Sequence, residues 1–175
     1  MGTVRIQLIN KLLLLIMLLI VAFSVSARGV YQTNEAFLSE TFDGKVPKSS
    51  VIWIKGDLRK TVADILSHKY NGMRVRYWQQ DGRSAWILNE IGKEQLITFG
   101  VVISAGKISN IKVLAFRESR GSEIRYPAFT RQFTDAGLIG LELDRHIDGV
   151  SGATLSVWAM TAVTRLALYL DTLTT

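Results

Sequence analysis

Seven residues near the C-terminal end of the chain have types and spacing that could support chemistry, and they read Asp148-Gly149-Val150-Ser151-Gly152-Ala153-Thr154. Ser151 is a favourable N-cap for a helix that begins here, Gly152 leaves room for a ligand to approach closely, and Thr154 offers a hydroxyl in the first turn. The unpaired N–H groups and the positive end of such a helix favour a phosphate. A serine N-cap with small neighbours is also common where helices begin without a ligand. The residue pattern therefore leaves phosphate binding and simple helix capping both open.

The complete heptapeptide resembles the flavinylation motif of the FMN-binding domain family. That family includes the C subunit of the sodium-translocating NADH:quinone reductase and the G subunit of the Rnf complex. The motif stands near the C-terminus ahead of an apolar helix, as it does in the family, and the resemblance covers about residues 70–173. It implies that an FAD:protein FMN transferase attaches FMN through its phosphate to Thr154. Further motif residues implied at the binding site are Ser151, Gly152, Ala153 and Asp148, and Asp148 is also implied to help the transferase activate the threonine.

A second segment departs from those two subunits, which often carry Glu-Thr-Pro-Gly-Leu-Gly upstream of the motif. The comparable stretch here runs from Arg117 to Pro127 and lacks the Pro-Gly-Leu-Gly core. Glu118 and Gly121 match part of the pattern, so the chain is more similar to a stand-alone flavinylated carrier than to a pump subunit. Arginines lie among aromatic residues through residues 116–133, and Tyr126 is a candidate to stack on the flavin. The same composition suits a solvated surface loop, and both interpretations stay open.

Other chemistries find little support in the sequence. The chain has no cysteine, which excludes iron–sulfur clusters, c-type haem attachment and thiol nucleophiles. Two distant histidines, His68 and His146, do not make a metal site. Residues 149–153 are not the Gly-x-Ser-x-Gly motif of serine hydrolases, because the fifth position is Ala153 and not glycine. The sequence therefore predicts no catalytic residue and no metal ligand, and redox work would depend on the flavin.

The helices and strands that position the motif can be predicted from the spacing of apolar residues along the chain. With Asp57 as N-cap, residues 58–70 place apolar side chains on one helical face, and Asn71-Gly72 ends that helix. Two hairpins follow, over residues 74–88 with a turn at Asp81-Gly82 and over residues 95–118 with a turn at Ala105-Gly106. Residues 117–133 are expected to be loop with a short helix, and residues 155–170 an apolar helix packed on the sheet. The predicted class is α+β, a small antiparallel sheet of two hairpins packed with helices.

The N-terminal segment predicts export. Arg5 and Lys11 precede an apolar run from Leu12 to Val25, and small residues end at Ala27, which is typical of a cleaved signal peptide over residues 1–27. An uncleaved membrane anchor is the alternative. Residues 28–50 are interpreted as a leader or tether and residues 51–175 as the FMN-binding domain. Removing the first 27 of 175 residues leaves 148 residues and lowers the net charge from +6 to +4, without the dense basic face of a nucleic-acid binder.

Together these observations predict a periplasmic or outer-face flavoprotein that passes electrons between a membrane-embedded redox protein and an extracytoplasmic acceptor. The alternative function is a flavin-dependent reductase subunit that acts directly on a small substrate. A third possibility is an exported binding module of the same fold that carries no flavin. A mature chain of this length leaves little room for a dedicated substrate domain, which favours the carrier.

Overall fold

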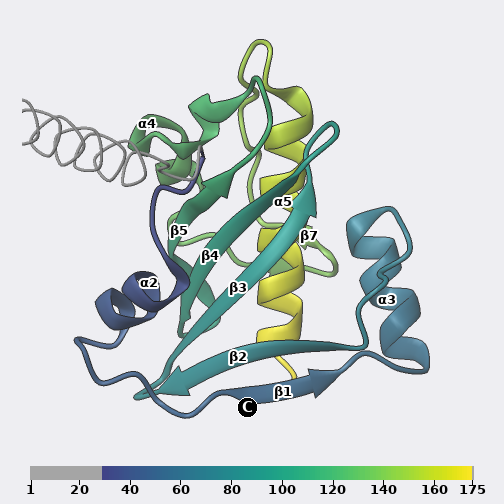
Figure 1. Cartoon of the computed structure of the whole chain (residues 1–175). Coiled ribbons are helices and arrows are strands. Elements are labelled where there is room, and N and C mark those ends of the chain that lie inside the picture. The colour runs from purple at the N-terminus through teal and green to yellow at the C-terminus, as the bar shows by residue number, and fades with distance from the viewer. Residues whose placement is uncertain (1–28, 175) are drawn as a thin grey trace, which may run out of the picture.

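The computed structural model describes residues 29–174, and they are built on one antiparallel sheet whose five strands are neighbours in chain order (Figure 1). The predicted signal peptide lies outside the described residues. The strands are β1 (Ser50–Trp53), β2 (Arg74–Gln80), β3 (Arg83–Ile91), β4 (Leu96–Ser104) and β5 (Lys107–Phe116). Both predicted hairpins are confirmed, and Asp81-Gly82 and Ala105-Gly106 adopt the positive φ angles of tight turns. The strand β1 was not predicted. It pairs with β2 and extends the sheet beyond the two hairpins.

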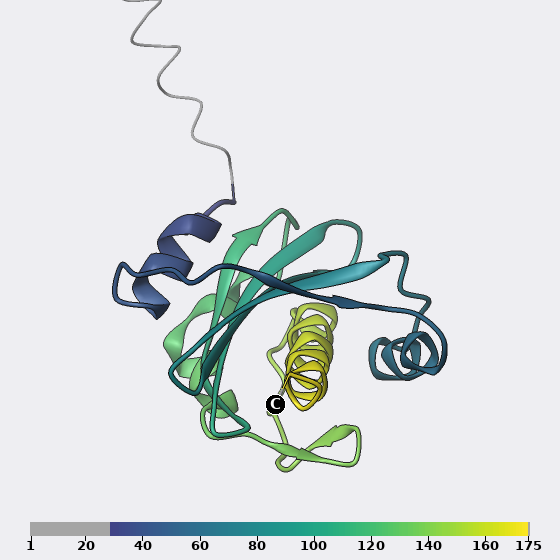
Figure 2. The ribbon, with the colours of Figure 1, turned by 90° about the horizontal axis from the view of Figure 1, so that it is seen from below.

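The C-terminal helix α5 (Thr154–Asp171) packs along one face of this sheet (Figure 1). It buries Met160, Val163 and Leu170 against alternate residues of the central strands, such as Trp86 and Val101, all at most 1 % exposed. The view in Figure 2 shows the sheet curving around α5, with the chain that leads into the helix on its other side. The predicted apolar helix and the α+β class are therefore confirmed.

The opposite face of the sheet is covered by the short helix α2 (Asn34–Thr41), as Figures 1 and 2 show. Phe37, Leu38 and Phe42 of this segment form a second core with Leu114 and other sheet residues that point away from α5. Thr33 caps the helix by accepting a hydrogen bond from the Ala36 N–H at 3.1 Å. Part of the segment expected to be a leader thus packs against the sheet and covers part of its second face.

The helix α3 (Asp57–Leu66) lies between β1 and β2 and is shorter than predicted. The prediction that Asp57 caps it is wrong, because Gly56 is the N-cap and Asp57 is the first helical residue. The prediction that it reaches Tyr70 is also wrong. The helix ends at Ser67, which adopts the left-handed conformation that commonly terminates helices.

The chain after α3 is held by Arg59, whose guanidinium donates hydrogen bonds to the Ile54, Tyr70 and Gly72 carbonyls at 2.7–3.2 Å. Three carbonyls from two separate segments converge on one charged side chain. These bonds hold the chain at Tyr70 and Gly72 next to the end of β1, in a non-helical path after the C-cap Ser67.

The connection from β5 to α5 contains short elements only. These are the 3₁₀ helices η1 (Ser122–Arg125) and η2 (Arg131–Phe133), the single-turn helix α4 (Pro127–Thr130) and a small hairpin of β6 (Leu138–Ile139) and β7 (Glu142–Leu143). The predicted loop therefore contains three helical turns where one short helix was expected. Among residues 29–174, no helix has the length and apolar character needed to cross a membrane.

Candidate functional site

The site begins at Thr154, which is the first residue of the 18-residue helix α5 and has an exposed side chain. The prediction that Ser151 caps this helix is wrong. Ala153 is the N-cap, no side chain accepts from the first turn, and Ser151 lies in the turn before it. The first turn also carries no acidic residue. The N–H groups at the start of a helix lack intrahelical acceptors, so a phosphate on Thr154 would meet donors and the positive end of the dipole.

The loop that presents Thr154 is held in place by its neighbours in space. The Asp148 N–H donates to Gln132 Oε1 at 2.7 Å, and Arg145 donates to the Thr134 and Asp135 carbonyls, both at 2.7 Å. The Asp148 carboxylate itself is 86 % exposed, with His146 Nε2 at 3.7 Å. The backbone of the motif is therefore held by hydrogen bonds, while the Asp148 side chain is exposed to solvent.

Gly152 has a φ of +79°, and a Cβ added there would meet no atom within 4 Å. The turn into α5 therefore requires glycine for its backbone conformation. The open space around it agrees with the predicted room for a ligand beside Thr154.

Two cavities meet at Thr154. The first, about 580 Å³, is called the Lys93–Arg120 cavity after its two basic residues and also includes Ser119, Gly152, Ala153 and Leu155. The second, about 400 Å³, is called the His146 cavity and includes Arg145, Ile147, Val157 and Trp158. Ligand pockets commonly measure ~300–1,000 Å³, so both are of suitable size. The first cavity is lined by two cationic side chains as well as by Thr154, and the second offers apolar and aromatic surface on the other side of Thr154.

Glu118 lines the Lys93–Arg120 cavity, and its carboxylate binds the backbone of the turn between β3 and β4. One oxygen, Oε1, accepts hydrogen bonds from the N–H groups of Lys93, Glu94 and Gln95 at 2.5–2.8 Å. Its limited burial raises the pKa of this carboxyl. The three backbone N–H groups and the Lys93 charge outweigh that effect and hold the pKa below its ordinary value. Glu118 thereby fixes the β3–β4 turn that carries Lys93 toward Thr154.

Gly121 lies against the beginning of α5. Its φ is +89°, and a Cβ there would lie 2.6 Å from Ser156 Oγ and 3.4 Å from the Ala153 Cα. Ser156 is 4 % exposed, so the loop and the helix are in close contact at this point. The structure thus brings Glu118 and Gly121 to the motif, both as parts of the frame around Thr154.

Tyr126 does not join this site. It lines a separate cavity of about 430 Å³ with Tyr31, and no residue of the motif lines it. The Arg125 guanidinium lies between the Tyr31 and Tyr126 rings, 4.5 and 4.6 Å from their centroids. The structure therefore gives Tyr126 a cation–π contact distant from Thr154.

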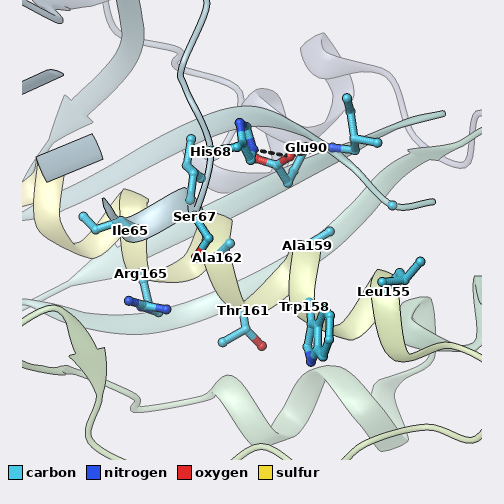
Figure 3. Close-up of a pocket in the computed structure, with 13 residues that line it drawn as sticks. Ile65, Ser67, His68, Glu90, Leu155, Trp158, Ala159, Thr161, Ala162 and Arg165 are labelled. Atoms are coloured by element: carbon cyan, nitrogen blue, oxygen red, sulfur yellow. Dashed lines mark hydrogen bonds and ion pairs between the residues drawn. The ribbon is translucent and has the colours of Figure 1, made fainter. Parts of the chain in front are cut away.

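A third cavity, about 290 Å³, flanks α5 beyond Thr154 and is called the His68 cavity. Figure 3 shows His68 and Glu90 next to each other across from the α5 residues Trp158, Ala162 and Arg165. It shares Leu155 with the Lys93–Arg120 cavity and Trp158 with the His146 cavity. The three cavities are therefore neighbours along the exposed side of the first turns of α5.

His68 and Glu90 form a hydrogen-bonded pair, with His68 Nε2 2.9 Å from Glu90 Oε1. The Glu90 side chain is only 7 % exposed, whereas that of His68 is 48 % exposed. Sequence reasoning missed this pair because its members are 22 residues apart, one after α3 and the other in β3. The one available signal was that Glu90 stands in the inward register of Trp86 and Leu88 in β3.

The residues present fit an FMN group. An exposed threonine hydroxyl stands at a helix start, Lys93 and Arg120 line the adjoining cavity, and the apolar surface of Leu155 and Trp158 continues beyond it. No group of three or more metal-ligating side chains occurs in the part of the chain that the structure describes. Comparison with known proteins agrees with the fit. Residues 92–169 match the family model described as the FMN-binding domain. No curated protein and no solved structure matches the chain.

Proposed function

Since residues 92–169 are an FMN-binding domain, we propose that the protein is an exported electron-transfer flavoprotein whose FMN is esterified to Thr154. The observation that carries the proposal is the position of the Thr154 hydroxyl. It is exposed at the first residue of α5, in a cavity that also contains Lys93 and Arg120. Bound FMN would supply one- and two-electron redox chemistry, and the chain would supply attachment and orientation.

Attachment requires an FAD:protein FMN transferase as partner. Thr154 Oγ forms a new bond to the phosphorus of the FMN half of FAD, the diphosphate bond breaks, AMP leaves, and the hydroxyl proton passes to a base. The exposed Asp148 carboxylate lies on the same loop and is available to the transferase during this step. Lys93 and Arg120 would then offset the negative charge of the phosphodiester.

The attachment is tested by co-expressing the full chain with the transferase. The protein should give a fluorescent flavin band on a denaturing gel and a mass increase of one FMN residue, and peptide mapping should locate it at Thr154. Thr154→Ala should abolish the band. Ser151→Ala, which removes the other hydroxyl of the motif, should keep it. A covalently yellow Thr154→Ala protein would refute the assignment.

The cellular location and the electron-carrier role are tested separately. N-terminal sequencing of envelope protein should begin at or near Arg28 if the signal is cleaved, whereas an intact membrane-embedded chain would favour the anchor. Chemically reduced, flavinylated protein should pass its electrons to membranes that contain a partner redox protein. Fast, saturable oxidation by one small metabolite without membranes would instead support the reductase subunit.

A further inference from the structure

The His68–Glu90 pair has the geometry of a proton site facing the flavin side of α5. Glu90 Oε1 accepts from the Ile91 N–H at 2.8 Å and from His68 Nε2 at 2.9 Å, and Glu90 is 6 % exposed. The other ring nitrogen of His68 lies 3.2 Å from the Lys69 carbonyl oxygen. Both nitrogens therefore face acceptors, an arrangement that an imidazolium satisfies completely and a neutral imidazole only in part.

The electrostatics of this pair agree with its geometry. Burial alone would lower the pKa of His68, but the hydrogen bonds to the Lys69 carbonyl and to Glu90, with the Glu90 charge, outweigh it and raise the pKa above its ordinary value. The remaining charged side chain in the cavity is Arg165, which is paired with Glu142 at 2.6 Å and donates to the Leu141 carbonyl. His68 is thus the group in this cavity whose charge changes near neutral pH.

The His68 cavity is within reach of a flavin on Thr154. Trp158 and Thr161 follow Thr154 by four and seven residues and line this cavity, which places them on the same side of the helix. The ribityl chain between the phosphate and the ring can span about one to two turns of helix, at about 5.4 Å per turn. Ala159 and Ala162 have small side chains, so they leave space for a ligand beside α5. Trp158 is 65 % exposed and offers an aromatic ring for the flavin to contact.

We propose that the flavin ring enters the His68 cavity and that the His68–Glu90 pair is its redox-linked proton site. The inference rests on the proposed attachment of FMN to Thr154. Two electrons from a reductant reduce the ring, which takes one proton from solvent and retains one negative charge. Neutral His68 then takes up a second proton from solvent, and the imidazolium, held by Glu90, balances the charge of the ring. The sum is two electrons and two protons for each flavin.

The His146 cavity is the competing location, because Thr154 itself lines it and it shares Trp158 and Thr161 with the His68 cavity. Its histidine is 87 % exposed and lies 3.7 Å from an equally exposed Asp148, so solvent screens its charge. Glu90, by contrast, has a buried carboxyl group, and His68 is its one ion-pair partner within residues 29–174. Each cavity has one histidine, and the two histidines therefore report which cavity receives the ring.

The test measures the midpoint potential of the flavinylated full chain from pH 6 to 9, with dithionite as reductant. Above the pKa of His68 in the oxidised protein, wild type should gain an additional tenfold change in the redox equilibrium per pH unit. That corresponds to about 30 mV per pH unit for a two-electron couple. His68→Gln, which can still bond to Glu90, should lack this additional slope. Equal slopes in the two proteins, or loss of the slope in His146→Gln instead, would overturn the proposal.

An NMR titration of His68 in the wild-type protein gives an independent readout that needs no variant. Its pKa should be higher in the dithionite-reduced protein than in the oxidised protein. In unflavinylated Thr154→Ala it should not respond to dithionite. A flavinylated protein whose His68 pKa is the same in both redox states would overturn this inference and leave the proposed function intact. A chain that the transferase does not label would overturn both.

Discussion

Replacing Gly121 by alanine should weaken the contact between the loop after β5 and the start of α5. The backbone there has φ +89°, which costs an L-residue about 1–2 kcal/mol. The new methyl group would also lie 2.6 Å from Ser156 Oγ and 3.3 Å from its Cβ, an overlap that typically costs about 1–3 kcal/mol in a packed region. The two effects together predict a loss of about 2–4 kcal/mol in the free energy of unfolding, allowing for some relaxation of the loop.

A matched control separates the two contributions. Gly44 has a similar φ of +79°, but a Cβ there would meet nothing within 4 Å. Gly44→Ala should therefore show only the backbone cost, about 1–2 kcal/mol. The double variant Gly121→Ala/Ser156→Ala removes the closest contact and should recover about 1–2 kcal/mol relative to Gly121→Ala, which is a coupling typical of touching residues.

Urea titrations with tryptophan fluorescence as the signal measure these differences in the free energy of unfolding. The rate of labelling by the transferase measures the effect on the Thr154 site. Because a Cβ at position 121 would also lie 3.4 Å from the Ala153 Cα, displacement of the loop should shift the Thr154 site, so Gly121→Ala should label more slowly than Gly44→Ala. The reasoning fails if Gly121→Ala is no less stable than Gly44→Ala. It also fails if Ser156→Ala provides no recovery.

Three further outcomes are expected. Glu118→Gln should lower the stability by about 1 kcal/mol at pH 7, since three N–H bonds lose a charged acceptor. The wild-type advantage should fade as pH falls below about 4.3, through the lowered pKa of Glu118, with Glu123→Gln as control in urea titrations. In the unflavinylated protein, His68→Gln should cost stability below about pH 6.5, and the difference should vanish as pH rises through the raised pKa of His68. Phe37→Ala should cost about 3–5 kcal/mol, whereas Val46→Ala, at a 42 % exposed position, should cost little in the same assay.

Features encoded by adjacent residues could be predicted from the sequence. The two hairpins follow from alternating strands around Asp81-Gly82 and Ala105-Gly106, and α5 follows from an apolar run after the motif. The FMN-binding domain was identified from the heptapeptide that ends at Thr154, and the family match over residues 92–169 confirms it. In each case the pattern that decides the structure is contained within a few neighbouring residues.

Features decided by distant contacts could not be predicted. The strand β1 is short, and it is defined by pairing with β2 across the whole of α3. The helix α2 has weak amphipathic character of its own and is fixed by Phe37, which packs over Gly100 so closely that a Cβ there would lie 2.7 Å from the ring. The end of α3 depends on Arg59 and three carbonyls from other segments. A sequence pattern has no local trace of such contacts.

The candidate site shows the same division, with a consequence for function. The sequence predicted no catalytic residue, and the fold brings together an acid–base pair, His68 and Glu90, that are 22 residues apart in the chain. At about 290 Å³, however, the His68 cavity is at the lower limit of ~300–1,000 Å³ for ligand pockets. A flavin ring that enters it would fill most of this volume. Under the proposal above, the proton chemistry of His68 would then serve the ring itself, as expected of a carrier that moves electrons with their protons.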